Sequence, residues 1–349
     1  MKEVYARNSL YLHSRQPQPE DKGSVLIFAG NLFCEMPGIF LTSALITAVI
    51  QLSGFAVAYT LRTELFYDIL GGLNFLSLAG YSAWAAADGL DTRKLATTVI
   101  FVCSRSWLLI FLAWRAHERK GDARFDGVKD KFGLFLVFWV AQGFWVMMVS
   151  SPVLLINAST AAPPALATSD LVLLGSFFLG VVCEVAADVT KARWVQRGRI
   201  GGFCQDGLWH YSRHPNYFGE MLQWWSAWLL ALASAPGGLT DVAWLATSAS
   251  PLFTMHILLN LPATGVAQAN GKSLRRYYEG KHAEAYAAYR SSTSILLPLP
   301  PRLYRAIPLP LKRTLFLDLS RYEYKPKERN PGHPSGYGSW EMEPFGHRD

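Results

Sequence analysis

Charged residues are scarce in this sequence. Asp, Glu, Lys and Arg together make up 17% of the 349 residues, whereas soluble domains carry about a quarter. Hydrophobic residues make up 51%, and twelve residues are Trp, a residue that is enriched at membrane interfaces. This composition disfavours an ordinary soluble enzyme and predicts an integral membrane protein.

Cysteine is scarce as well, and no C-x-x-C pair occurs. The four positions are Cys34, Cys103, Cys183 and Cys204. Their scatter disfavours a disulfide framework and a zinc site. His210 and His214 are four residues apart, but Pro215 follows them directly. We expect them to precede a helix instead of sharing its face, so no metal site is predicted.

A cleavable signal peptide is also not evident, because the first 22 residues are polar and lack a short apolar core. Membrane insertion is therefore expected to depend on internal helices. The formal net charge is +7, but the basic residues lie between apolar runs, so we expect no nucleic-acid partner. Such a chain suits the endoplasmic reticulum in a eukaryote or the inner membrane in a bacterium.

Seven apolar runs are long enough to cross a membrane. They cover residues 39–61, 67–87, 95–114, 132–156, 171–189, 217–235 and 242–261. The predicted fold class is all-α, a polytopic membrane helix bundle of about seven transmembrane helices. We expect residues 1–38 to form an interfacial or re-entrant segment, residues 39–301 the membrane domain, and residues 302–349 an interfacial collar followed by a mobile tail.

The loops between these runs differ in charge. Residues 115–131, residues 191–213 and the segment from residue 272 are rich in Lys and Arg, whereas 157–170 and 234–241 contain neither. The positive-inside rule places the basic loops in the cytoplasm. With seven spans the N-terminus would then lie on the other side despite its own cations.

Polar groups concentrate where the sixth run begins, in GLWHYSRHPNYFGEMLQWW. The proline is favoured at the first position of a helix. That helix would present free N–H groups beside Arg213 and His214, which suits a phosphate group. Asn216 and Glu220 share one face of it. Alternatively, Arg213 and His214 anchor the helix to lipid headgroups.

Ionisable residues also lie inside apolar runs. Glu184, Asp188 and Lys191 share one helical face by their spacing, and Arg105 lies in an apolar run of its own. Charges at such depth are costly, so they are functional candidates by default. A salt-bridged helix end is the alternative for the first three, and Arg105 requires a carboxylate or a phosphate as partner.

Two further segments contain candidate residues. HAEAYAAYR predicts a short helix in which Tyr286, Tyr289 and Arg290 could cover an adenine or clamp a phosphate. The alternative is an amphipathic helix lying on the bilayer. Asp68 and Tyr67 begin the second run, where either could donate a proton to a substrate carbonyl. For Asp68 the favoured interpretation is a favourable charge at a helix start.

The basic loop AWRAHERKGDARFD adds Arg115, Asp122 and Arg124. Each of them could contact a phosphate or fix the topology, and topology is the favoured interpretation.

These motifs, in this order, resemble the steroid 5α-reductase-like superfamily of membrane enzymes. The match is to its largely uncharacterised branch, with A-D-x-x-K at residues 187–191 and G-L-W-x-Y-S-R-H-P-N-Y-F-G-E at residues 207–220, followed by W-W at 224–225. G-D-x-R-F at residues 121–125 and Y-x-x-Y-R-x-x-T at residues 286–293 also match.

The resemblance implies a seven-helix bundle that binds NADPH in a cytoplasmic cavity and reduces a C=C bond of an α,β-unsaturated lipid or steroid ketone. The expected partners are a lipophilic small-molecule substrate and membrane lipid, with no obligate protein partner. Asp68 or Tyr67 is the expected catalytic acid. The reductases have Asn where this chain has Glu184, so this contact is expected to differ. The expected cofactor-binding residues are Arg105, Glu184, Asp188, Lys191, Arg213, His214, Asn216, Tyr217, Glu220, Tyr286, Tyr289 and Arg290.

Two alternatives stay open. The R-H-P-N-Y stretch also resembles isoprenylcysteine carboxyl methyltransferases and phospholipid methyltransferases, which bind S-adenosylmethionine and have a later pair of glutamates. At the comparable place this chain has GVAQAN, with Gln268 and no acid. The other alternative is a non-enzymatic lipid- or sterol-binding membrane protein that keeps the fold. A transporter is not favoured, because no inverted repeat is evident in the sequence.

Overall fold

A computed structural model describes residues 22–86, 88–119, 123–159, 166–261, 264–266, 275–278 and 280–323. Within these ranges the chain is helical, and the one β-type pairing is an isolated bridge between Ser212 and Ser294. The all-α prediction is confirmed. The expected mobile tail beyond residue 323, Asp122 of the G-D-x-R-F motif and Gln268 lie outside the described residues.

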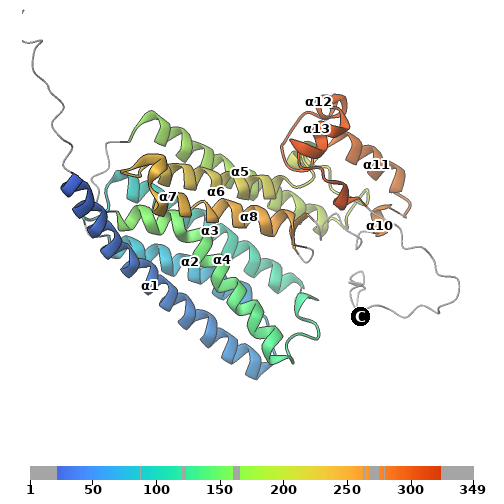
Figure 1. The fold of residues 1–349 in the computed structure, drawn as a ribbon. Coiled ribbons are helices and arrows are strands. Elements are labelled where there is room, and N and C mark those ends of the chain that lie inside the picture. The colour runs from blue at the N-terminus through green and yellow to red at the C-terminus, as the bar shows by residue number, and fades with distance from the viewer. Residues whose placement is uncertain are drawn as a thin grey trace, which may run out of the picture.

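The long helices form one bundle (Figure 1). They are α1 (Lys22–Leu61), α2 (Tyr67–Trp84), α3 (Thr92–Arg119), α4 (Phe132–Ala158), α5 (Thr168–Gln196), α6 (Pro215–Ala233), α7 (Val242–Ala246) and α8 (Ala249–Leu259). Five described segments are long and apolar enough to cross a membrane, namely Gly38–Leu61, Thr92–Glu118, Phe132–Ala158, Thr168–Gln196 and Val242–Leu259. With α2 and α6 packed among them, the chain is a multi-pass membrane protein.

The first helix is longer than the first apolar run. α1 is continuous over 40 residues, and its apolar spanning part is Gly38–Leu61. The helix therefore extends into the segment that we expect at the membrane interface. The assignment of residues 1–38 to an interfacial segment stays a prediction.

The seventh predicted helix is interrupted. α7 ends at Ala246 and α8 begins at Ala249. Pro251 has no N–H, and in a continuous helix its ring would clash with the carbonyl of Thr247. Instead, the Ser250 amide donates to the Thr247 carbonyl over 3.0 Å, which closes a tight turn between α7 and α8.

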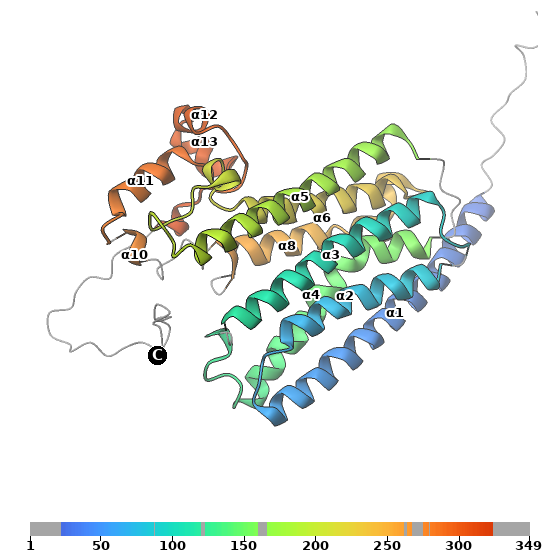
Figure 2. The same cartoon turned by 180° about the vertical axis from the view of Figure 1, so that it is seen from behind.

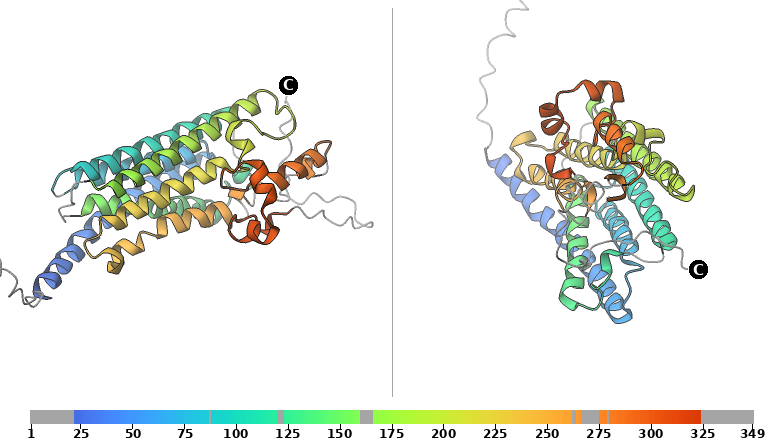
Figure 3. Two further views of the ribbon diagram at one scale, coloured as in Figure 1. Left: turned by 90° about the horizontal axis from the view of Figure 1, so that it is seen from above. Right: turned by 90° about the vertical axis from the view of Figure 1, so that its right-hand side faces the viewer.

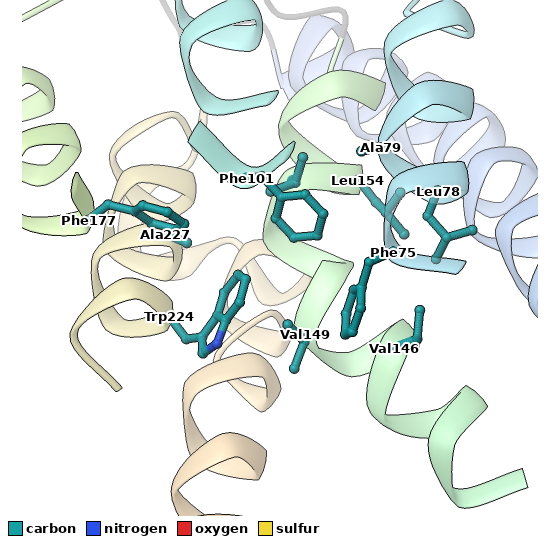
Figure 4. Close-up of a cluster of buried hydrophobic side chains, with 11 residues drawn as sticks. Phe75, Leu78, Ala79, Phe101, Val146, Val149, Leu154, Phe177, Trp224 and Ala227 are labelled. Carbon is teal, nitrogen blue, oxygen red and sulfur yellow. The ribbon is translucent and has the colours of Figure 1, made fainter. Parts of the chain in front are cut away.

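Two groups of helices share the core. α1, α2, α3 and α4 pack on one side, and α5, α6 and α8 on the other (Figure 2). Figure 4 shows the aromatic rings between them: Phe101 of α3 and Phe177 of α5 point toward Trp224 of α6. The ring centroids of Phe101 and Phe177 lie 5.7 and 5.8 Å from that of Trp224, edge to face, an arrangement that favours aromatic pairs.

Glycines bring α5 and α6 together. A Cβ atom on Gly219 would lie 2.5 Å from the Gly180 carbonyl oxygen and 2.8 Å from the Glu184 amide nitrogen. A Cβ on Gly180 would lie 2.7 Å from the Gly219 carbonyl oxygen. Small residues are how membrane helices reach such distances. The contact fixes the polar faces of α5 and α6 against each other.

The last described elements gather at one end of the bundle (Figure 3). They are α10 (Arg275–Tyr278), α11 (Ala283–Ser292), α12 (Pro301–Ala306) and α13 (Leu309–Thr314). The basic α3–α4 and α5–α6 connections lie at the same end, whereas α1 begins at the opposite end. The positive-inside rule predicts that this end faces the cytoplasm, and the orientation stays a prediction.

Prolines limit the collar to short helices. The repeated prolines after residue 297 rule out one regular helix, but α12 and α13 each form with Pro at the first or second position, where no N–H is needed. Tyr304 is fully buried, and its hydroxyl donates to Asp318 over 2.9 Å. It therefore holds the collar together.

The close contact between Gly180 and Gly219 predicts that a larger side chain there lowers the stability of the protein. Gly219→Ala should lower the free energy of unfolding by about 1–3 kcal/mol, because the added methyl group overpacks against the backbone of α5. Thermal unfolding in detergent would measure this. Gly175→Ala is the matched control, since α5 has nothing within 4 Å of a Cβ at that position. Equal effects at both positions would contradict the close-contact account.

Candidate functional site

A cavity of about 190 Å³ lies between α3, α4, α5, α6 and α8, in the half of the bundle where α3 and α5 end and α6 begins. Five of the expected cofactor-binding residues line it: Glu184, Asp188, Asn216, Tyr217 and Glu220. The i, i+4 spacings on α5 and α6 explain why both pairs of polar residues face the same space. The sequence pattern therefore identified the polar wall of this cavity.

Asp188 and Asn216 join the two helices at the cavity. The Asn216 side-chain amide donates to Asp188 Oδ1 over 3.2 Å. Asn216 Oδ1 is buried and has no hydrogen-bond partner. Buried polar atoms are normally paired, so this oxygen is available to accept a hydrogen bond from a ligand.

Glu184 is held by a chain of buried polar groups. Gln223 Nε2 donates to Glu184 Oε2 over 2.7 Å, and the Ser104 hydroxyl donates to Gln223 Oε1 over 2.5 Å. Gln223 and Ser104 are buried. The chain links α5, α6 and α3, and it fixes the orientation of the Glu184 carboxyl group.

Arg105 has the carboxylate partner that its buried position requires. Its guanidinium donates to Glu220 Oε1 and Oε2 over 3.2 and 3.4 Å. It also lies 4.6 Å from the Trp224 ring centroid, and Trp224 Nε1 donates to Glu220 Oε1 over 2.8 Å. Arg105 is fully buried and positions Glu220 without lining the cavity itself.

Arg213 points away from the cavity. Its Nε donates to the Thr293 carbonyl over 3.1 Å, and Nη2 donates to Asp318 over 2.5 Å. Burial alone would lower the pKa of this guanidinium, but the adjacent Asp318 carboxylate outweighs that effect and raises it. Arg213 therefore attaches the collar to the start of α6.

The residues around Arg213 support the same attachment. The Ser212 hydroxyl donates to the Leu296 carbonyl over 2.7 Å. The Tyr289 hydroxyl donates to the Trp209 carbonyl over 2.5 Å, and burial raises the pKa of Tyr289 so that its proton is retained. The His214 ring stacks on Tyr217 with centroids 5.1 Å apart, which orients a cavity-lining side chain.

Three other expected residues lie outside the cavity lining. The Lys191 ammonium lies over the rings of Trp194 and Trp209, 4.6 and 4.3 Å from their centroids. Tyr286 packs in a cluster of tyrosines with Phe203, and the Arg290 guanidinium lies 5.4 Å from the Tyr278 centroid. Whether these residues contact a cofactor stays a prediction.

The two expected acids also lie outside the lining. The Tyr67 hydroxyl donates to the Phe138 carbonyl over 2.9 Å. The Asp68 carboxylate is paired with Arg124 at 3.3 Å and with Arg115 at 3.9 Å. Their role as proton donors stays a prediction, although Asp68 reaches the cavity indirectly because Arg115 lines it.

An apolar wall completes the cavity, and motif reasoning missed it. Its members are Leu108, Phe111 and Leu112 of α3, Trp145 of α4, and Ile257 and Leu258 of α8. Thr254 of α8 also lines the cavity and adds a buried hydroxyl that has no hydrogen-bond partner. The α3 members recur with Arg115 at helical spacing, a signal that the sequence does contain. The cavity therefore combines an acceptor-rich wall with an apolar one. The part of the chain that the structure describes contains no cluster suited to a metal ion.

The buried ion pair between Arg105 and Glu220 predicts that the effects of the two residues on stability are strongly coupled. Glu220→Gln should lower the free energy of unfolding by about 3 kcal/mol, because it leaves a buried guanidinium without its counter-charge. Arg105→Gln combined with Glu220→Gln should cost less than the sum of the single changes. A double-mutant cycle by thermal unfolding would measure the coupling, and additive effects would contradict a direct pair.

Comparison with known proteins agrees with the resemblance at a coarse level. No curated protein and no solved structure matches this chain. Residues 54–293, which contain the whole cavity, match the family described as "Protein of unknown function (DUF1295)". The chain belongs to this family, which is in the steroid 5-alpha-reductase-like superfamily.

Proposed function

We propose that this protein is an integral membrane reductase that uses NADPH to reduce the C=C bond of an α,β-unsaturated lipid or steroid ketone. One observation carries the proposal: the cavity has carboxyl and amide oxygens on one wall and apolar side chains on the other. A polar cofactor end and a lipophilic substrate require such a pair of walls.

The donor and acceptor groups fit the nicotinamide end of the cofactor. A nicotinamide carboxamide and a ribose offer N–H and O–H donors, and the unpartnered Asn216 Oδ1 accepts hydrogen bonds, as do the Asp188 and Glu220 carboxylates. A volume of about 190 Å³ suits one ring system. The fit therefore concerns the nicotinamide end of the cofactor and not the whole dinucleotide.

Different residues of this chain would bind the cofactor, exclude water and act on the substrate. NADPH, when bound, supplies a hydride for the β-carbon of the enone. Asn216, oriented by Asp188, and Glu220, oriented by Arg105, would hold the carboxamide and ribose. The apolar side chains of α3 and α8 would exclude water and pack on the lipid. Asp68 or Tyr67 would stabilise the developing enolate at the substrate carbonyl, as the resemblance implies. The α-carbon would then take a proton from Tyr217, which lines the cavity.

One observation favours a second candidate, methyl transfer from S-adenosylmethionine. Three carboxyl groups, those of Glu184, Asp188 and Glu220, line the cavity together with Arg115. An excess of acidic groups favours a cationic ligand such as a sulfonium. The same binding experiment separates the two candidates.

The direct test is the thermal stability of the purified protein with NADPH, NADH or S-adenosylmethionine. A ligand at 100 times its Kd should stabilise the folded state by about 2.7 kcal/mol. We expect NADPH to give this shift. Stabilisation by S-adenosylmethionine alone would favour methyl transfer, and no shift with any of the three would favour the non-enzymatic lipid-binding alternative.

Asn216→Ala should weaken NADPH binding about tenfold, because one hydrogen-bonded amide is lost from the cavity. Gln51→Ala is the matched control. Gln51 is also a buried amide, but it donates to Asn74 over 3.1 Å between α1 and α2 and does not line the cavity. Titration calorimetry would measure both variants, and equal affinities for Asn216→Ala and wild type would refute the cofactor placement.

A further inference from the structure

Two carboxyl groups meet at the polar wall of the cavity. The backbone of Glu184 on α5 lies against Gly219 of α6, where a Cβ atom would be 2.8 Å from the Glu184 amide nitrogen. Glu220 is the next residue on α6, and both glutamates line the cavity. Their carboxyl groups lie within hydrogen-bonding reach of each other. Ionised carboxylates only accept hydrogen bonds, and two of them in contact repel each other, so this contact requires a proton.

The donors around the two carboxyl groups indicate which one carries that proton. Glu220 accepts two hydrogen bonds from the Arg105 guanidinium over 3.2 and 3.4 Å, and another from Trp224 Nε1 over 2.8 Å. In the described part of the chain, Glu184 accepts one, from Gln223 Nε2 over 2.7 Å. Hydrogen-bond donors stabilise the ionised form of a carboxyl group, and charged donors do so most strongly. This arrangement favours Glu220 as the carboxylate and Glu184 as the neutral acid.

A closed ring of hydrogen bonds supports the same assignment. Arg105 Nη2 donates to the Ser104 hydroxyl over 2.9 Å, and that hydroxyl donates to Gln223 Oε1 over 2.5 Å. Gln223 in turn donates to Glu184. A proton on Glu184 closes the ring at Glu220, which is paired with Arg105. The ring then contains one guanidinium and one carboxylate, so its charges balance, as buried charges require.

Asp188 does not change this assignment, although it also lines the cavity. It lies one turn further along α5. Its carboxyl group accepts a hydrogen bond from Asn216 over 3.2 Å and has Arg115 as a nearby cation. It therefore supplies neither a donor nor a positive charge to Glu184.

We propose that Glu184 and Glu220 share one proton, and that Glu184 carries it as a neutral hydrogen-bond donor to the carboxamide oxygen of the nicotinamide. The donor role rests on the proposed function, whereas the shared proton does not. A carboxamide offers N–H donors and a carbonyl acceptor. The carboxylate and amide oxygens of the wall would accept from its N–H groups. On binding, the Glu184 O–H would turn from Glu220, which keeps its other donors, to the carbonyl oxygen.

Infrared spectroscopy of the full-length protein in nanodiscs tests the shared proton. At neutral pH the wild type should show the C=O stretch of a protonated carboxyl group, shifted in deuterated water, and Glu184→Gln should lose this intensity. Glu64→Gln is the matched control and should keep it, because Glu64 is also buried but pairs with Lys129 at 2.7 Å. Equal intensity in the wild type and Glu184→Gln, or an equal loss in Glu64→Gln, would overturn the proposal.

Titration calorimetry with NADPH tests the donor role. Glu184→Gln keeps a neutral donor at this position, so its Kd should stay within about twofold of the wild type. Glu184→Leu removes the donor and should raise the Kd about tenfold. A loss of affinity in Glu184→Gln as large as that in Glu184→Leu, or no loss in either, would refute the donor role. If Glu184→Leu folds poorly, Glu184→Gln still tests whether a carboxylate is required.

The two experiments also separate this proposal from the proposed function. Infrared intensity that Glu184→Gln removes, in a protein that does not bind NADPH, supports the shared proton and refutes the reductase. NADPH binding without such intensity refutes the shared proton and leaves the reductase standing.

Discussion

The close approach of α5 and α6 is the contact on which the site depends. Gly180 and Gly219 let the two backbones meet, and the polar residues follow from that register. One turn beyond Gly180 lies Glu184, and Asp188 follows one turn later. Asn216 and Glu220 flank Gly219 on the facing helix. The acceptor-rich wall is therefore a consequence of helix packing, and a side chain at either glycine would separate its two halves.

The arginines of the bundle fall into two groups, those buried in an ion pair and those that are partly exposed. Arg105 and Arg213 are buried and bonded to Glu220 and Asp318, so they connect parts of the structure. A third such pair, Arg93 with Asp170, joins α3 to α5 at the opposite end. Burial with a single carboxylate is costly to break, which suits a structural role. Arg115 and Arg124 stay partly exposed and share the carboxylate of Asp68.

Much of the fold and of the candidate site could be predicted from the sequence, because helix spans and i, i+4 faces are local properties. Those signals identified seven helices and the polar residues of α5 and α6. They did not identify Asp318 as the partner of Arg213, since 105 positions separate the two and no local pattern connects them. Whether Arg213 also contacts a phosphate stays a prediction. Pro251 explains a break before it in the chain, but the apolar run extends across residues 247–248, where α7 and α8 are separated.

The central claim is that the cavity between α3, α5, α6 and α8 binds the nicotinamide end of NADPH. Amide hydrogen exchange of the full-length protein in nanodiscs, with and without NADPH, tests it most directly because it locates the ligand along the chain. We expect slower exchange in residues 207–220 and at the C-terminal end of α5. Unchanged exchange there, with slowing confined to other segments, would contradict it.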